Sequence, residues 1–124
     1  MTYDIMIDDG KNPSVLNAGA NLQKGQFVGL NLQPANLHAD IVGVCLKDTA
    51  QNNPISLGCI GTFYLQVSVA PSATLNVGDE LEVKDSSTLQ AKSTGIVVAK
   101  AYEKIDNTAG GSPIVRKIPV KIVK

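Results

Sequence analysis

The stretch Cys59–Lys84, CIGTFYLQVSVAPSATLNVGDELEVK, decides the fold of this chain. Apolar and polar residues alternate from Thr62 to Val69, which predicts a strand with one buried face, formed by Phe63, Leu65, Val67 and Val69. Pro71 ends this strand, because proline lacks the N–H that a sheet ladder needs. Gly78 can then supply a tight turn into a second alternating run, so the stretch predicts antiparallel β-structure.

More strands are predicted after this stretch. Residues 85–88 join the second run to residues 89–92 as a hairpin. Residues 106–113 have no apolar anchor, and we expect them to form the most mobile loop. The last strand, residues 114–123, carries Pro119 and several lysines, which are typical of the edge of a sheet.

The residues before the stretch repeat part of its pattern. Residues 22–30 share with residues 75–83 the frame Leu, two residues, Gly, two residues, apolar, any, apolar, which suggests two similar half-barrels. We therefore predict an all-β chain with little helix, folded as a single small antiparallel β-barrel or sandwich-like domain. Residues 1–14 would form an N-terminal arm or edge strand, and residues 15–124 the β domain.

Composition limits the partners of this domain. The chain has 124 residues, a formal net charge of zero and no Trp, so it is long enough for one domain with a thin aliphatic core. A domain of this kind often buries further surface against a partner subunit, so oligomerisation is expected. The basic cluster near the C-terminus, Arg116, Lys117, Lys121 and Lys124, is too small to predict direct nucleic-acid binding and is interpreted as a solvated face.

The N-terminus and the cysteines indicate a cytosolic origin. Residues 1–4 lack the features of a signal peptide, and no apolar run approaches the ~20 residues of a membrane span, so no membrane partner is expected. Cys45 and Cys59 each lie in an apolar run and are predicted to be buried thiols. We expect synthesis in a reducing cytosol.

No group of residues predicts catalysis. His38 beside Asp40 could act as a lone general base, but a solvent-facing loop histidine is the better interpretation. Glu80 and Glu82 are assigned to the solvent side of their strand, and residues 110–112 lack the Lys-Ser or Lys-Thr of a phosphate loop. We therefore predict no catalytic residue, no cofactor-binding residue, no metal ligand and no enzyme activity.

Two segments are candidates for contacts with other molecules. Tyr3, Ile5 and Ile7 share one side of an alternating run, which could be a first strand or an arm that pairs with another molecule. Residues 96–102 are apolar on both faces, so this strand lies either at the centre of a barrel or against a neighbouring subunit. The second option makes Val97, Ala99 and Ala101 a candidate subunit interface.

A series of short motifs between residues 20 and 103 resembles a known family. They are Ala20–Val28 (ANLQKGQFV), Ile41–Ala50 (IVGVCLKDTA), Gly61–Leu65 (GTFYL), Leu75–Leu81 (LNVGDEL) and Gly95–Ala101 (GIVVAKA). Their order is similar to that in the small capsid decoration, or cement, proteins of tailed bacteriophages. The chain departs from the family pattern at Cys45 and Lys47, where small residues are preferred.

This resemblance implies a structural virion protein. It would be made in the host cytoplasm and would bind the outer surface of the expanded capsid, as a homotrimer at three-fold positions. Its partner would be the major capsid protein, with Tyr3, Ile5 and Ile7 as the capsid-binding arm. A phage tail or baseplate module, or a domain that binds a host-surface glycan or receptor, is the alternative.

Overall fold

The computed structural model describes residues 16–123, and within this range it contains β-strands and no helix. The strands are β1 (Phe27–Gly29), β2 (Ile41–Cys45), β3 (Leu57–Gly58), β4 (Gly61–Val69), β5 (Thr74–Leu75), β6 (Glu80–Asp85), β7 (Thr88–Ala91), β8 (Ala99–Ala101), β9 (Ile105–Asp106) and β10 (Ile114–Ile122). The predicted all-β class is confirmed. The division at residue 14 stays a prediction, because the segment before it lies outside the described residues.

Five strands form a closed barrel in the order β10-β4-β7-β6-β8. All neighbours in this barrel are antiparallel except β4 and β7, which run parallel. The hairpin between β6 and β7 forms at the predicted position. Because each barrel strand has a neighbour on both sides, closure removes the open sheet edges at which other chains could pair.

β4 shows why the alternating pattern produces a barrel strand. Its inward positions Leu65, Val67 and Val69 are buried, while Tyr64 and Gln66 between them are exposed. Removing these aliphatic side chains from water stabilises the strand by roughly 1.5–3 kcal/mol for each side chain that is fully buried. The predicted buried face is therefore confirmed at Leu65, Val67 and Val69, whereas Phe63 is only half-buried and Ser68, predicted for the opposite face, is buried.

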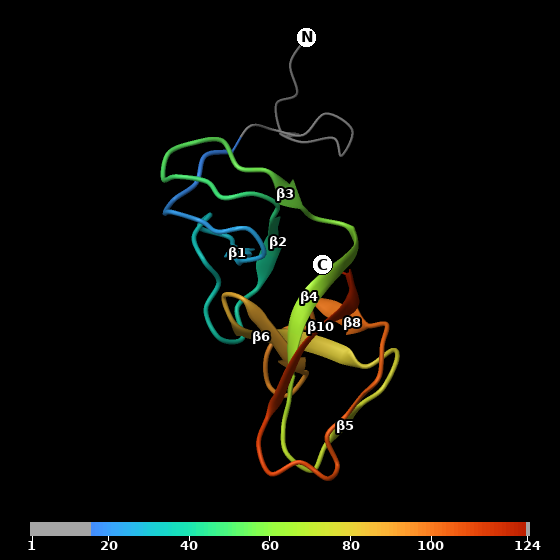
Figure 1. Cartoon of the computed structure of the whole chain (residues 1–124). Helices are drawn as coiled ribbons and strands as arrows, with labels where there is room; N and C mark the ends of the chain where they lie inside the picture. Colours follow the sequence, from blue (N-terminus) through green and yellow to red (C-terminus); the bar gives the residue numbers. More distant parts are fainter. Residues whose placement is uncertain (1–15, 124) are drawn as a thin grey trace.

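β1, β2 and β3 form a separate three-stranded sheet beside the barrel (Figure 1). Phe27, Ile41 and Val44 from this sheet belong to the same hydrophobic core as the barrel side chains, so the two sheets form one packed unit. The prediction of two similar half-barrels is wrong. Strands from residues 61–122 close the barrel alone, although residues 22–30 share a sequence frame with residues 75–83.

β10 is not the edge strand that its proline and lysines predicted. It pairs with β4 along its whole length and with β8 at Val120–Ile122. Pro119 accepts a hydrogen bond through its carbonyl from the Tyr102 backbone N–H at 3.0 Å, so its ring nitrogen also faces the β8 side. The pairing between β10 and β8 covers only Val120–Ile122, so Pro119 lies just outside it and no ladder hydrogen bond is lost. This is why a central strand tolerates proline here.

Candidate functional site

The predicted contact residues lie in different environments. Ala99 and Ala101 of β8 point into the barrel and are fully buried within the chain itself, while Val97 is half-buried just before the strand. Of these three side chains, only Val97 keeps surface that a neighbour could touch, so a subunit interface here stays a prediction. Tyr3, Ile5 and Ile7 lie outside the described residues.

The most elaborate polar cluster surrounds Glu82, in the middle of β6. Its Oε1 accepts hydrogen bonds from the backbone N–H of Ser93 at 2.5 Å and of Gly95 at 3.1 Å. Its Oε2 accepts one from Gln90 Nε2 at 2.9 Å and lies in contact with His38 Nδ1. Glu82 has no solvent-exposed surface, so the prediction that it faces solvent is wrong.

Hydrogen bonding determines the charge state of this buried carboxyl. Burial alone would raise the pKa of Glu82, but the N–H groups of Ser93, Gln90 and Gly95, together with the charge of His38, hold this pKa below its usual range. Glu82 is therefore a carboxylate near neutral pH. Both of its oxygens have partners, and the carboxylate ties two loops to β6.

The loop that carries His38 covers Glu82 from the side of the three-stranded sheet. The backbone N–H of His38 donates to Val83 O at 2.9 Å, and its φ of 63° lies in the left-handed region. His38 lies in a loop as predicted, but its side chain is only 36% exposed because Nδ1 faces the buried Glu82. No local sequence signal joins residues 44 positions apart, and only the fold brings His38 to Glu82.

A second polar anchor holds the loop after β9. Asn107 is buried, and its Nδ2 donates to the carbonyls of Val69, Ala70 and Ser112 at 3.1, 3.0 and 2.9 Å. The prediction of a loop with no anchor considered only apolar side chains and missed this amide. Like the Glu82 cluster, Asn107 satisfies buried backbone groups that would otherwise cost free energy.

The two cysteines differ in exposure. Cys45 is buried and its Sγ donates to the Lys47 carbonyl at 2.9 Å, as expected for a structural thiol. Cys59 is exposed, so the prediction that both are buried is wrong. The two-residue strand β3 ends at Gly58 and β4 begins at Gly61, which leaves Cys59 in the connection between them.

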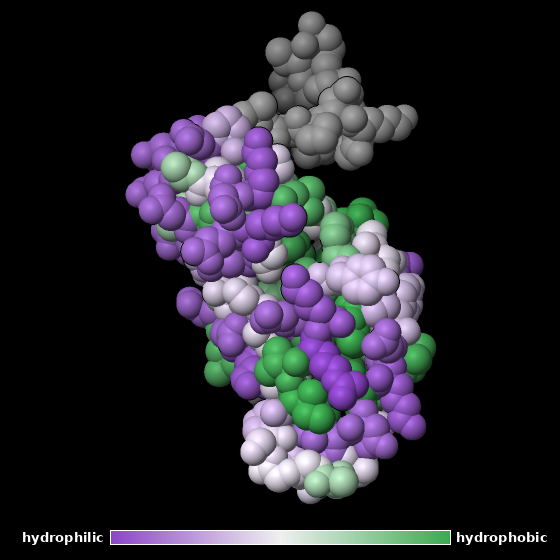
Figure 2. Space-filling model, in the orientation of Figure 1, coloured by the Kyte–Doolittle hydropathy of each residue, from purple (hydrophilic) through white to green (hydrophobic). Residues whose placement is uncertain are grey.

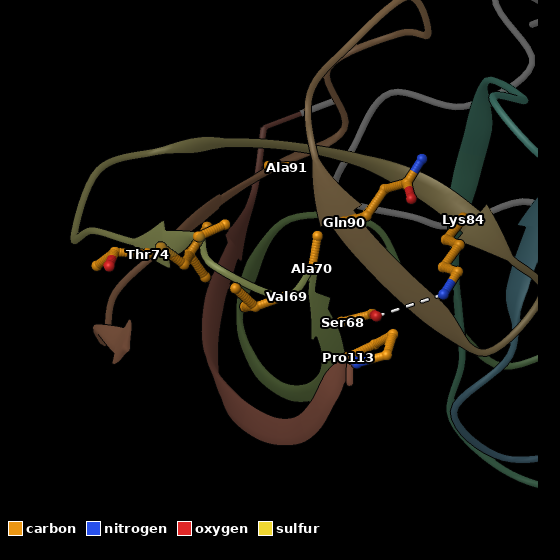
Figure 3. Close-up of a pocket in the computed structure, with 10 residues that line it drawn as sticks. Ser68, Val69, Ala70, Thr74, Lys84, Gln90, Ala91 and Pro113 are labelled. Atoms are coloured by element: carbon orange, nitrogen blue, oxygen red, sulfur yellow. Dashed lines mark hydrogen bonds between the residues drawn. The ribbon is translucent and has the colours of Figure 1, made fainter. Parts of the chain in front are cut away.

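A hollow of about 220 Å³ lies at one end of the barrel (Figure 3). Small side chains such as Val69, Ala70 and Pro113 line most of it, and Thr74 lies on the side opposite Lys84. Lys84 is its one ionisable lining residue, and its Nζ donates to Ser68 Oγ at 3.3 Å. The lining does not bring together the nucleophile, base and orienting group that covalent catalysis requires.

The described residues define a small all-β structural module whose polar clusters tie its own loops together. Residues 16–123 contain no group of three or more His, Cys, Asp or Glu side chains placed to hold a metal ion. The same range has no helix with the length and apolarity needed to cross a membrane.

Comparison with known proteins gives this module a family. The family described as phage cement protein matches residues 7–118, and the chain belongs to it. Cement proteins are structural components of the virion that associate with phage capsids. No curated protein and no solved structure gives a significant match.

Proposed function

We propose that this protein binds the outer surface of the expanded phage capsid and stabilises it, as a homotrimer at three-fold positions. Membership of the phage cement family over residues 7–118 carries this proposal. The closed barrel supports it, because barrel strands without open edges suit a protein that must bind the capsid without aggregating with itself.

The proposed mechanism is thermodynamic linkage. A ligand that binds one state of a shell and not another stabilises the bound state by its binding free energy. Three subunits joined in a trimer combine weak contacts through effective concentration, so each contact needs only modest affinity. The bound trimer would therefore join neighbouring copies of the major capsid protein and resist the outward pressure of packaged DNA.

Co-sedimentation with expanded heads that lack the protein tests this function. We expect saturable binding to expanded heads and much weaker binding to unexpanded shells of the same major capsid protein. Equal binding to both would contradict stabilisation of the expanded state. Absence of binding to both, with binding to tail structures or to a glycan array, would favour the tail or receptor-binding alternative.

Two more detailed parts of the proposal concern particular residues. Tyr3, Ile5 and Ile7 would add a strand to the major capsid protein, so deletion of residues 1–12 should weaken binding to expanded heads; undiminished binding would reject the arm.

Val97 would lie at the trimer interface. Val97→Glu should then reduce the trimer fraction measured by sedimentation on heads or at high protein concentration, and an unchanged fraction would reject this interface.

A further inference from the structure

Two tyrosines and a proline form a row across the outer face of the barrel. Tyr64 on β4 lies opposite Pro119 on β10, and the Tyr102 backbone donates to Pro119 on the other side of β10. The three residues are therefore neighbours across three adjacent segments of the sheet, which are β4, β10 and the residue after β8. Tyr64 is 72% exposed and Tyr102 46% exposed, which leaves both rings open to a partner.

Strand alternation fixes the direction of this row. The residues next to the row in the chain are buried inside the barrel: Leu65, Ile118, Val120 and Ala101. Because side chains alternate between the two faces of a strand, Tyr64, Pro119 and Tyr102 point away from the barrel interior. Tyrosine offers a large rigid apolar surface and a hydroxyl, a combination that is enriched in protein interfaces. Figure 2 shows green and pale atoms among purple hydrophilic ones on this side of the barrel.

A pair of overlapping hollows adjoins the row, between the three-stranded sheet and the barrel. They have volumes of about 180 and 320 Å³ and share Lys24, Gly25, Tyr64, Leu65 and Lys117. Neither hollow is lined by a carboxylate. Tyr64 thus belongs both to the row and to a concave, positively charged site.

Lys24 and Lys117 line this site, and Lys100 and Lys121 lie beyond it on the outer face of the barrel. Lys121 lies directly opposite Lys100 in the β10–β8 ladder, an arrangement of like charges that is unfavourable in the free protein. Lys24, Lys100, Lys117 and Lys121 form no ion pair with another described residue. Three acids lie beside these residues: Glu80 is opposite Lys100 in the ladder, Asp48 accepts a hydrogen bond from the Lys24 backbone N–H at 2.8 Å, and Glu103 follows Tyr102 in the chain.

We propose that this tyrosine–lysine face, defined as Lys24, Tyr64, Lys117, Pro119 and Tyr102, binds an acidic segment of the major capsid protein. The carboxylates of that segment would contact the lysines at the hollow, and an apolar side chain beside them would pack on Tyr64. Charge complementarity between these carboxylates and Lys24 and Lys117 would select the partner. The inference rests on the proposed capsid-binding function and names the contact surface for it.

The test compares variants for equilibrium binding to expanded heads at low and high salt. Lys24→Glu/Lys117→Glu reverses the charge at the hollow, and Lys92→Glu, beyond the end of β7 and outside the face, serves as the charge control. We expect the double variant to lose about tenfold or more in affinity and most of its salt dependence, and the control to change less than about threefold.

A second pair of variants tests the aromatic part of the face. Tyr64→Ser should weaken binding about tenfold or more, as expected for truncation of a central interface aromatic. Leu30→Ser, at a side chain 73% exposed beyond the end of β1, should leave binding unchanged. Circular dichroism and thermal melting check that all four variants fold as the wild type does; each changed side chain is exposed, so no loss of core packing is expected.

The outcomes separate this inference from the proposed function. If the wild type does not bind heads, the capsid-binding function fails and the inference fails with it. If the wild type binds and the face variants bind as well as their controls, the function stands and this face is not the contact. Equal affinity of the wild type for duplex DNA, lost in the double variant, would also overturn the assignment to an acidic protein segment.

Discussion

At the scale of single residues, the fold depends on a few buried polar groups. Glu82 holds the turn at residues 93–95 and the loop around His38, and Asn107 holds the loop after β9. A buried polar group that loses its partner costs about 1–3 kcal/mol. Each of these two side chains therefore contributes to the fold about as much as one buried aliphatic side chain.

Glu82→Gln should lower the free energy of unfolding by about 1–3 kcal/mol at pH 7, because the amide cannot accept hydrogen bonds with both terminal atoms. Glu80→Gln on the same strand is the control, since Glu80 is exposed, and should change stability by less than about 0.5 kcal/mol. Urea denaturation measures both. Equal stability of the two variants would contradict the role of Glu82.

The pKa of Glu82 also predicts how stability depends on pH. Because the folded-state pKa lies below the ordinary value of 4.5, the carboxylate stabilises the fold fully above about pH 4.5, and this contribution is lost as the pH falls through the lower folded-state pKa. The stability difference between wild type and Glu82→Gln should therefore shrink in acid. Urea denaturation from pH 7 to pH 3 checks this, and a constant difference would count against it.

Substitutions at Gly110 and Gly111 provide a test variant and its control for the Asn107 anchor. A Cβ at Gly110 would lie 1.8 Å from Asn107 Oδ1, whereas a Cβ at Gly111 would meet nothing within 4 Å. Gly110→Ala should destabilise the protein by about 1–3 kcal/mol, since overpacking forces the hydrogen-bonded amide to move, and Gly111→Ala should have little effect. Thermal melting of both variants distinguishes them, and similar melting temperatures would argue against a rigid anchor.

At the scale of elements, β10 completes the barrel. It comes last in the chain, pairs with β4 over nine residues and separates β4 from β8. Its side chains Ile118, Val120 and Ile122 are buried in the common core. A strand in this position contributes to stability through both ladders and through packing.

Ile118→Ala should reduce the free energy of unfolding by about 2–5 kcal/mol, because the fully buried side chain leaves a cavity among close-packed neighbours. Val115→Ala on the same strand removes an exposed side chain and should cost less than about 0.5 kcal/mol. Chemical denaturation measures the difference. A small effect at Ile118 would mean that β10 contributes little to the packed core.

At the scale of the whole molecule, the proposed function predicts that binding of this protein raises the thermal stability of the expanded head. Expanded heads should melt at a higher temperature when the protein is bound, and the shift should grow with the logarithm of free protein concentration. Calorimetry of heads at several concentrations measures this. A shift that does not depend on concentration, or an equal shift for unexpanded shells, would contradict selective binding to the expanded state.

The sequence by itself determined the class of the fold and the positions of its longer strands. Period-two alternation is a local property, so residues 62–69 and the turn at residues 85–88 could be assigned without a structure. The ordered motifs between residues 20 and 103 also indicated the family that residues 7–118 match.

Only the tertiary structure decided which strands pair and which polar groups are buried. Pro119 suggested an edge, but the position of β8 determines whether a missing N–H matters. Glu82 occupies an outward position on its strand, and it is buried because the turn at residues 93–95 and the sequence-distant loop at His38 close over it. The pairing of β10 and the burial of Glu82 both depend on tertiary contacts. Local sequence patterns carry no signal for such contacts, because the fold and not the neighbouring residues in the sequence determines which groups meet.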